Sequence, residues 1–398
     1  MASLPPEVKS KIIDLLEDTE ATGVPCREYG ALSLLWPDVL FRIREHRFRT
    51  VNLENRARVR LLLEIIEGAP SVGTMVRKVK VKPGMFTAER AMLYTPSNLP
   101  LLFAALSRVT SISLLNLGPS SIHLIHSLPP TVTDVCLYVS DVSIDNILES
   151  LIALPGLESL AIRGYWGTNR CTSLQRNLVQ FTALRRLEID ADILIMERVM
   201  SPELFPNVEC FIIKHAAISS QSRVWHLDQL LRKWDATLKE IHLPRPSTRF
   251  VSNSCVTLPT ALESMYFDIF LTGGEVCDHD HLTFFTRALE DRRSAGRTLK
   301  SLRIGVQFDY ADDADPQDPM LRRFDEIVSS PELGLQHLEW SIHWYRRGDI
   351  GANNAIGVDV HLLNEIIFPN IDARFFQADG RKAFSTTAVV VVKETLVF

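Results

Sequence analysis

The densest group of possible metal ligands in this sequence is Cys277-Asp278-His279-Asp280-His281. A thiolate and two imidazoles are zinc ligands, but a tetrahedral site needs groups that converge, and these five side chains are neighbours in a loop-like segment. The acidic stretch Asp309 to Asp318 lacks the turn glycine and the closing glutamate of an EF-hand loop. We therefore interpret both stretches as solvated loops, and we expect no metal site and no cofactor.

The motifs that mark nucleotide binding and hydrolysis do not occur. The sequence has no G-x-G-x-x-G, no G-x-x-x-x-G-K-[ST], no G-x-S-x-G and no H-E-x-x-H. No pairing of a nucleophile with a base is apparent either, so we expect that the chain is not an enzyme.

Three lysines form the clearest charged pattern, because Lys78, Lys80 and Lys82 alternate with Val79 and Val81. In a strand this period of two places all three ammonium groups on one side. One interpretation is an ordinary soluble strand near the end of a sheet. The other is a basic start to a binding groove for an acidic or phosphorylated target.

The lysine strand belongs to a recurring hexad with the order apolar, two residues, apolar, one residue, apolar. Its clearest copies are Leu157–Ile162, Leu184–Ile189 and Leu299–Ile304. Looser copies bring the total to twelve and start at Phe48, Val76, Val109, Val132, Val208, Leu238, Leu262, Leu335 and Ile371. This spacing resembles the strand of a leucine-rich repeat.

The hexad predicts a strand that buries one side. Its last two apolar residues lie two positions apart and point the same way, and stacked copies would share a core that helices cover. Helical stripes alternate with the hexads, and we expect insertions at Thr272 to Asp280, Asp309 to Pro319 and Tyr345 to Gly357, and a last strand at Ala388 to Val392. The predicted fold of residues 48–398 is therefore an α/β right-handed solenoid of irregular leucine-rich repeats.

The residues between the apolar positions would point outward and line a concave face. Tyrosine and arginine dominate binding hot spots. Together with the three lysines, the candidate target-binding residues are therefore Tyr138, Arg163, Arg186, Tyr266 and Arg303.

Residues 1–47 depart from this pattern and predict a small helical unit. Pro5 and Pro6 suit the start of a helix, and Pro37 must end another. The first helix is either a buried cap on the repeats or a helix that contacts both its own domain and a partner. The loop that precedes the second helix contains Gly23, Pro25 and Gly30 and is expected not to be helical.

The stretches Leu4-Pro5-Pro6-Glu7-Val8, Leu32-Ser33-Leu34-Leu35-Trp36 and Phe48-Arg49-Thr50-Val51 resemble a fungal-type F-box, which fungi attach to leucine-rich repeats. The resemblance covers about 45 residues. It implies binding to the Skp-type adaptor of a cullin–RING ubiquitin ligase. The residues that it implies for this contact are Leu4, Pro5, Val8, Ile12, Leu16, Leu32, Leu35 and Trp36.

Composition is compatible with this interpretation. The net charge of the 398 residues is −5, which gives no global attraction to nucleic acid or to an anionic membrane. The six cysteines are scattered, and no signal peptide or membrane span is expected, so we expect a cytoplasmic or nuclear protein. The predicted function is substrate recognition for a ubiquitin ligase, with an unknown target protein; the alternative is a repeat protein that scaffolds or inhibits another protein without ligase coupling.

Overall fold

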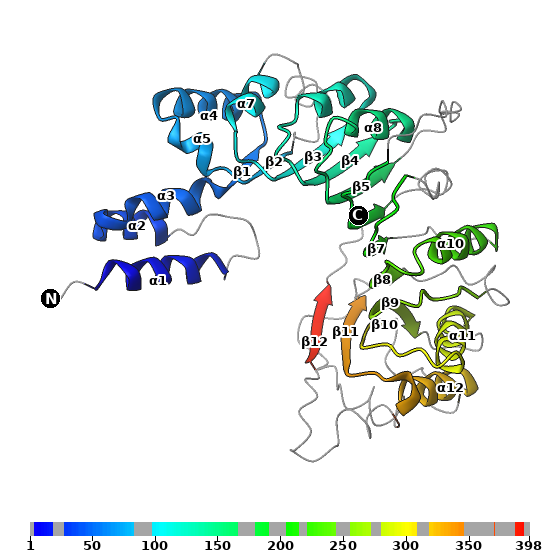
Figure 1. The fold of residues 1–398 in the computed structure, drawn as a ribbon. Helices are drawn as coiled ribbons and strands as arrows, with labels where there is room; N and C mark the ends of the chain where they lie inside the picture. Colours follow the sequence, from blue (N-terminus) through cyan, green and yellow to red (C-terminus); the bar gives the residue numbers. More distant parts are fainter. Residues whose placement is uncertain are drawn as a thin grey trace. The chain divides into compact units, whose positions relative to one another are not determined.

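The chain folds into two compact units, Met1–Leu184 and Arg185–Phe398. Both contain parallel strands and helices (Figure 1). The structure is a computed structural model that describes residues 4–18, 28–82, 98–165, 180–190, 204–214, 221–243, 255–271, 280–308, 318–345, 370 and 387–393.

The first unit has an open parallel sheet whose strands follow the chain order. Each strand pairs in parallel with the next one along the chain. Apolar and polar residues alternate in the strands, and in β4 the alternate residues Val135, Leu137 and Val139 are buried. The strands are β1 (Thr50–Leu53), β2 (Lys78–Val81), β3 (Ser111–Leu117), β4 (Asp134–Ser140) and β5 (Ser159–Tyr165).

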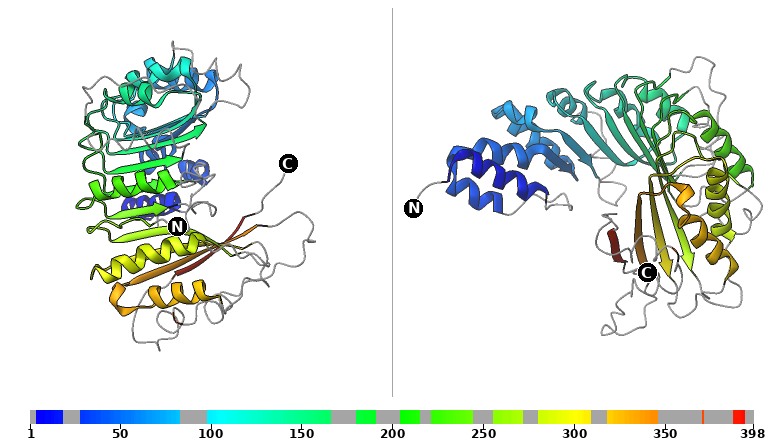
Figure 2. Two further views of the ribbon diagram at one scale, coloured as in Figure 1. Left: turned by 90° about the vertical axis from the view of Figure 1, so that its right-hand side faces the viewer. Right: turned by 60° about the horizontal axis from the view of Figure 1, so that its bottom comes forward.

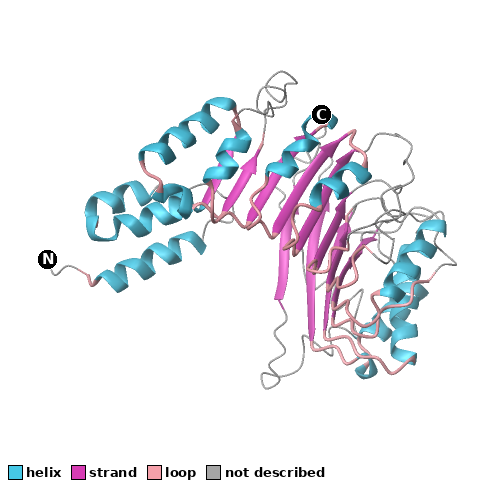
Figure 3. Ribbon diagram, turned by 45° about the horizontal axis from the view of Figure 1, so that its top comes forward, coloured by secondary structure: helices cyan, strands magenta, loops and turns pink. Residues whose placement is uncertain are grey.

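Helical segments connect these strands and lie on one side of them, as Figure 3 shows. The side chain of Asn55 starts α4 by accepting a hydrogen bond from the Arg58 N–H at 3.0 Å. The predicted stripe of α8, from Ile144 to Leu151, is buried. The segments are α4 (Arg56–Gly68), α5 (Ser71–Met75), α7 (Leu99–Ala105), η2 (Pro119–Ser127) and α8 (Ile144–Leu151).

Four helical segments precede β1 and pack together, with a small core of their own. The core consists of Ile13, Val39 and Ile43, and Leu32 and Trp36 pack against it. The helix α2 ends one residue before Trp36, as Pro37 requires. The segments are α1 (Pro6–Asp18), α2 (Glu28–Leu35), η1 (Pro37–Val39) and α3 (Leu40–Arg49).

The second unit also has a parallel sheet whose strands follow the chain order. The final strand, β12, includes the predicted strand Ala388 to Val392. The strands are β6 (Arg186–Asp190), β7 (Cys210–Ile213), β8 (Glu240–Leu243), β9 (Ser264–Leu271), β10 (Ser301–Phe308), β11 (His337–Tyr345) and β12 (Thr387–Lys393).

Helices cover one side of the strands of this unit, and Figure 2 shows them in two further views. They are α10 (Gln221–Lys233), α11 (Asp280–Ser294), α12 (Pro319–Val328) and the short η4 (Pro331–Leu333). The rings of Phe267 and Phe285 stack with centroids 4.1 Å apart and so join β9 to α11. The buried Arg292 guanidinium donates hydrogen bonds to the backbone carbonyls of Pro259, Leu262 and Thr298, which fixes the entry to β9.

A shared backbone carbonyl links successive hexads. The carbonyl oxygen of Thr133 accepts hydrogen bonds from the N–H groups of Glu158 and Ser159 at 2.8 and 2.9 Å. The same arrangement recurs at the carbonyls of Arg77, Thr110, Arg185, Glu209, Lys239, Glu263 and Lys300, with distances of 2.8–3.1 Å. The first apolar residue of the hexads from Val76 to Leu335 is at most 3% exposed. Hexad and strand therefore coincide, and the prediction of parallel strands that alternate with helices is confirmed.

Two local predictions were wrong. Phe48 and Arg49 belong to α3 and not to a strand, because the helix continues to Arg49 and extended backbone begins at Thr50. Gly30 lies inside α2, where the packing of Leu32 and Trp36 on the helical core outweighs its low helix propensity. The three predicted insertions and the hexad at Ile371 lie largely or wholly outside the described residues.

The buried hexad residues give a stability prediction. Leu160 and Leu187 are both 0% exposed. Leu160→Ala and Leu187→Ala should each lower the free energy of unfolding of their unit by about 2–5 kcal/mol, since each leaves a cavity. The control is Leu101→Ala, because Leu101 is 62% exposed and should cost under about 0.5 kcal/mol. Equal denaturant midpoints for all three variants and the wild type would show that the hexads do not form the core.

Candidate functional site

Ion pairs hold α1 in register with the next helices. The Lys9 ammonium, only 4% exposed, lies 2.8 Å from Asp38 Oδ2 in η1. The carboxylate of Asp14 accepts from Arg42 Nε at 3.0 Å and contacts His46 Nε2 at 2.9 Å, both on α3. Lys9 pairs with η1, and Asp14, which comes later in α1, pairs with α3, which follows η1, so α1 runs in the same direction as η1 and α3. The first turn of α1 therefore lies near η1.

Five exposed apolar side chains belong to the helix ends near η1. Leu34 and Leu35, at the end of α2, are 85% and 70% exposed, and Phe41 in the first turn of α3 is 65% exposed. Leu4 and Val8, at the start of α1, are 44% and 41% exposed. We call these five residues the apolar end. Folding of the helices does not bury them, so they are available to another molecule.

The structure separates the predicted adaptor-binding residues into two groups. Leu4, Pro5, Val8 and Leu35 are exposed, and Ile12 is half-buried. Leu32 and Trp36 pack against the helical core, where they stabilise the unit itself. The side chain of Leu16 lies outside the described part of the chain.

Sequence reasoning missed two members of the apolar end, Leu34 and Phe41. Each lies beside the apolar stripe that faces the helical core, and neither is part of that stripe. An apolar residue off the core-facing stripe of a helix is the signal that would have found them.

The outward face of the first sheet carries the lysine row. Lys78, Lys80 and Lys82 are exposed, whereas Val79 and Val81 are buried. In the sheet register Lys78 lies between Thr50 and Ser111, and Lys80 lies between Asn52 and Ser113. The predicted separation of the lysines from the valines is therefore confirmed, and the register neighbours of Lys78 and Lys80 on both sides are uncharged.

Two other predicted residues of this face contact each other. Tyr138 and Arg163 are register partners on β4 and β5. The Arg163 guanidinium carbon lies 5.1 Å from the centroid of the Tyr138 ring, and the guanidinium also donates a hydrogen bond to the phenol oxygen. This cation–π pair presents a flat, partly apolar surface to solvent.

In the second unit, the outward strand residues form a chain of polar contacts. His242 Nε2 lies 2.5 Å from Glu240 Oε1, and the His242 ring centroid is 5.2 Å from that of Tyr266. Arg303, the register partner of Tyr266, forms an ion pair with Glu339 at 2.7 Å. The charged members of this face are therefore largely paired.

The Tyr266 side chain in this series of contacts is partly buried. The Tyr266 hydroxyl donates to Asp268 Oδ1 at 2.8 Å, and burial together with this carboxylate raises the pKa of the phenol. A Cβ atom on Gly305 would lie 2.0 Å from the same oxygen, so a larger residue at position 305 would force the Asp268 carboxylate to move. The third predicted residue here, Arg186, donates to Cys210 Sγ at 3.4 Å, and burial raises the pKa of that thiol to about 12.

Charges also alternate along the edge where the chain enters these strands. The series is Arg185, Glu209, Lys239, Glu263 and Lys300, one residue from each successive hexad. Lys239 Nζ lies 2.7 Å from Glu209, and Lys300 Nζ lies 2.8 Å from Glu263. These hydrogen bonds from lysine lower the pKa of both glutamates.

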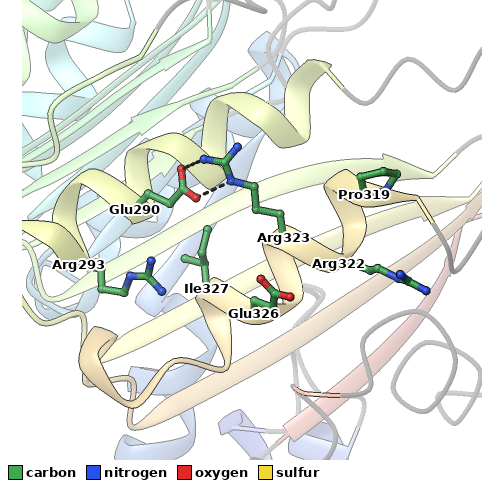
Figure 4. A pocket seen from close by; sticks show the side chains of 7 residues that line it. All are labelled: Glu290, Arg293, Pro319, Arg322, Arg323, Glu326 and Ile327. Atoms are coloured by element: carbon green, nitrogen blue, oxygen red, sulfur yellow. Dashed lines mark hydrogen bonds and ion pairs between the residues drawn. The ribbon is translucent and has the colours of Figure 1, made fainter.

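A depression of about 420 Å³ lies between α11 and α12 (Figure 4). Its walls carry Glu290, Glu326, Arg293, Arg322 and Arg323, with Pro319 and Ile327. Arg323 forms a bidentate pair with Glu290, with both N–O distances 2.6 Å. Small-molecule sites are mostly apolar, so this charged and open depression does not resemble one.

The ranges that the structure describes contain neither a helix long and apolar enough to cross a membrane nor a group of three or more metal-ligating side chains. Cys277 to His279 of the densest ligand cluster lie outside those ranges, as do residues 309–317 of the acidic stretch.

No model of a protein family matches this chain, and the search of curated proteins finds no match to it.

The Lys9–Asp38 pair gives a prediction about the helical unit. Asp38→Asn removes the anionic partner of a buried ammonium, so the amides of α1 should exchange hydrogen faster at pH 7. The hydrogen bond from Lys9 lowers the pKa of Asp38, so the stabilisation is complete above the unfolded pKa of about 3.9. This stabilisation disappears as the pH falls through the lower pKa that Asp38 has in the folded protein.

Hydrogen exchange of α1 across a pH series is the measurement. The control is Glu54→Gln, which removes the exposed Arg58–Glu54 pair and should leave α1 unchanged. Identical α1 exchange in Asp38→Asn and wild type at pH 7 would show that the pair does not hold the helix.

Proposed function

We propose that this chain is a substrate-recognition subunit of a cullin–RING ubiquitin ligase. Its N-terminal helices bind a Skp-type adaptor, and the outward face of its strands binds a target protein. The chain itself performs no chemistry. It raises the local concentration of the target near the enzyme that the adaptor recruits.

The apolar end is the observation that carries this proposal. Three of its five members, Leu4, Val8 and Leu35, are among the residues that the F-box resemblance implies for adaptor contact. Among the apolar side chains described on α1, Ile13 is buried and Val8 is 41% exposed, which favours a helix that contacts a partner over a buried cap. Large apolar side chains that the described residues leave exposed at one end of a helical unit are a feature expected of a partner-binding surface.

The strand pattern supports the second half of the proposal. Hexads that form parallel strands, each followed by a helical or irregular return, are what irregular leucine-rich repeats contain. In such repeats the residues between the apolar positions need not contribute to the core. Their side chains are therefore free to be selected for binding.

Charged substitutions in the apolar end test the adaptor contact. The double variant Leu34→Asp/Leu35→Asp should weaken capture of a recombinant Skp-type adaptor at least about tenfold, because binding would bury two carboxylates in an apolar contact. Both side chains are exposed, so the unfolding midpoint should not change.

The matched control is Leu61→Asp/Leu101→Asp. These two leucines are 56% and 62% exposed and lie on α4 and α7 of the same unit. Equal loss of capture in both double variants would remove the apolar end as the adaptor site. A wild-type chain that fails to bind any Skp-type adaptor would instead favour a scaffold or inhibitor without ligase coupling.

A further inference from the structure

We infer that the lysine row on β2 binds an extended acidic segment whose carboxylates occupy alternate positions. The lysine row consists of Lys78 and Lys80 of β2 and of Lys82, which directly follows the strand. The inference rests on the proposal that the strand face binds a target, and it does not depend on adaptor binding.

The first step is that these charges have no ion-pair partner among the residues that the structure describes. Across the described residues, no carboxylate forms an ion pair with any of the three lysines. The register neighbours of Lys78 and Lys80 on β1 and β3 are Thr50, Asn52, Ser111 and Ser113. In the second unit, by contrast, Lys214 pairs with Glu188 at 2.9 Å and Arg303 pairs with Glu339. The lysine row is therefore a positive surface that the fold itself leaves unneutralised.

The second step is the charge of the surrounding chain. From Arg42 to Lys82 the sequence has eleven Lys or Arg and four Glu, a net charge of +7, whereas the whole chain carries −5. Local excess of one sign attracts ligands of the other sign and speeds their association. The ligand class that fits this surface is therefore anionic.

The third step is spacing. Lysines two residues apart on a strand project at intervals of about 6.6 Å. An extended peptide has the same rise, so acidic residues at alternate positions repeat at the same interval. A segment of the type Glu-x-Glu-x-Glu therefore presents one carboxylate to each ammonium group.

The fourth step distinguishes a peptide from a nucleic acid. Proteins that bind single strands combine basic grooves with aromatic side chains on which the bases stack. The outward residues of β1 to β3 next to the lysines are hydroxyl and amide side chains, and none is aromatic. The surface thus offers charge and hydrogen bonds to a peptide but no stacking platform to a base.

Fluorescence anisotropy of the full chain with two labelled peptides tests the inference. One peptide has three glutamates at alternate positions among serines, and the other has the same composition with the glutamates adjacent. At low salt the alternating peptide should bind at least about threefold tighter than the adjacent one. Its affinity should fall steeply at 0.5 M salt, where screening is strong.

The variant Lys78→Gln/Lys80→Gln/Lys82→Gln should bind the alternating peptide at least about tenfold more weakly. The control is Arg44→Gln/Arg47→Gln/Arg60→Gln, which removes the same charge from exposed helical positions of the same basic segment and should change affinity less than about threefold. Adaptor capture should be unchanged in the lysine variant, which separates this test from that of the apolar end.

Three outcomes would overturn the inference. Equal affinity for the two peptides would reject the spacing argument. An equal loss of peptide affinity in the lysine variant and in the arginine control would show that the net positive charge of the segment, and not the lysine row, attracts the peptide. Tighter binding of an oligouridylate than of either peptide, lost in the lysine variant, would identify the row as a nucleic-acid contact instead.

Discussion

The shared carbonyl between successive hexads is the interaction on which the sheets depend. One backbone oxygen at the second hexad position accepts from two consecutive N–H groups of the next copy, at 2.8–3.1 Å. This contact fixes the register of each parallel pair before the strand proper begins. A slip of one residue would turn every apolar side chain of the next strand toward solvent, so register and core burial specify the same arrangement.

This register separates the side chains that fold the protein from those that face outward. The three apolar positions of a hexad are buried against the helices. The positions between them lie on the opposite side of the strands, where most are partly or fully exposed and a few, such as Glu188 and Ile212, are buried. Tyr138 and Arg163 form a cation–π pair in this outward layer, and Tyr266 and Asp268 share a hydrogen bond there. The strand faces of both units are therefore surfaces whose chemistry the core does not determine.

The strands and most helices were predictable because their signals are local and repeated. Leu160 and Leu187 could be assigned to the core from spacing alone. The end of α3 could not be predicted in this way. Phe48 fits the hexad pattern, but it continues a helix that tertiary contacts stabilise. The ion pairs could not be predicted from the sequence either, because contacts such as Glu240–His242 and Lys9–Asp38 depend on side-chain geometry. Leu34 and Phe41 escaped the sequence interpretation because exposure, not residue type, distinguishes them from core leucine and phenylalanine.

Charge balance on the outward layer is not a requirement of folding. Exposed ion pairs contribute little to stability, and three ammonium groups about 6.6 Å apart repel one another only weakly in water. The fold therefore tolerates the unpaired lysines of β2 as readily as the alternating charges from Arg185 to Lys300. Stability therefore does not decide between these two patterns. A paired surface satisfies its own charges, whereas an unpaired row leaves its charges for a ligand.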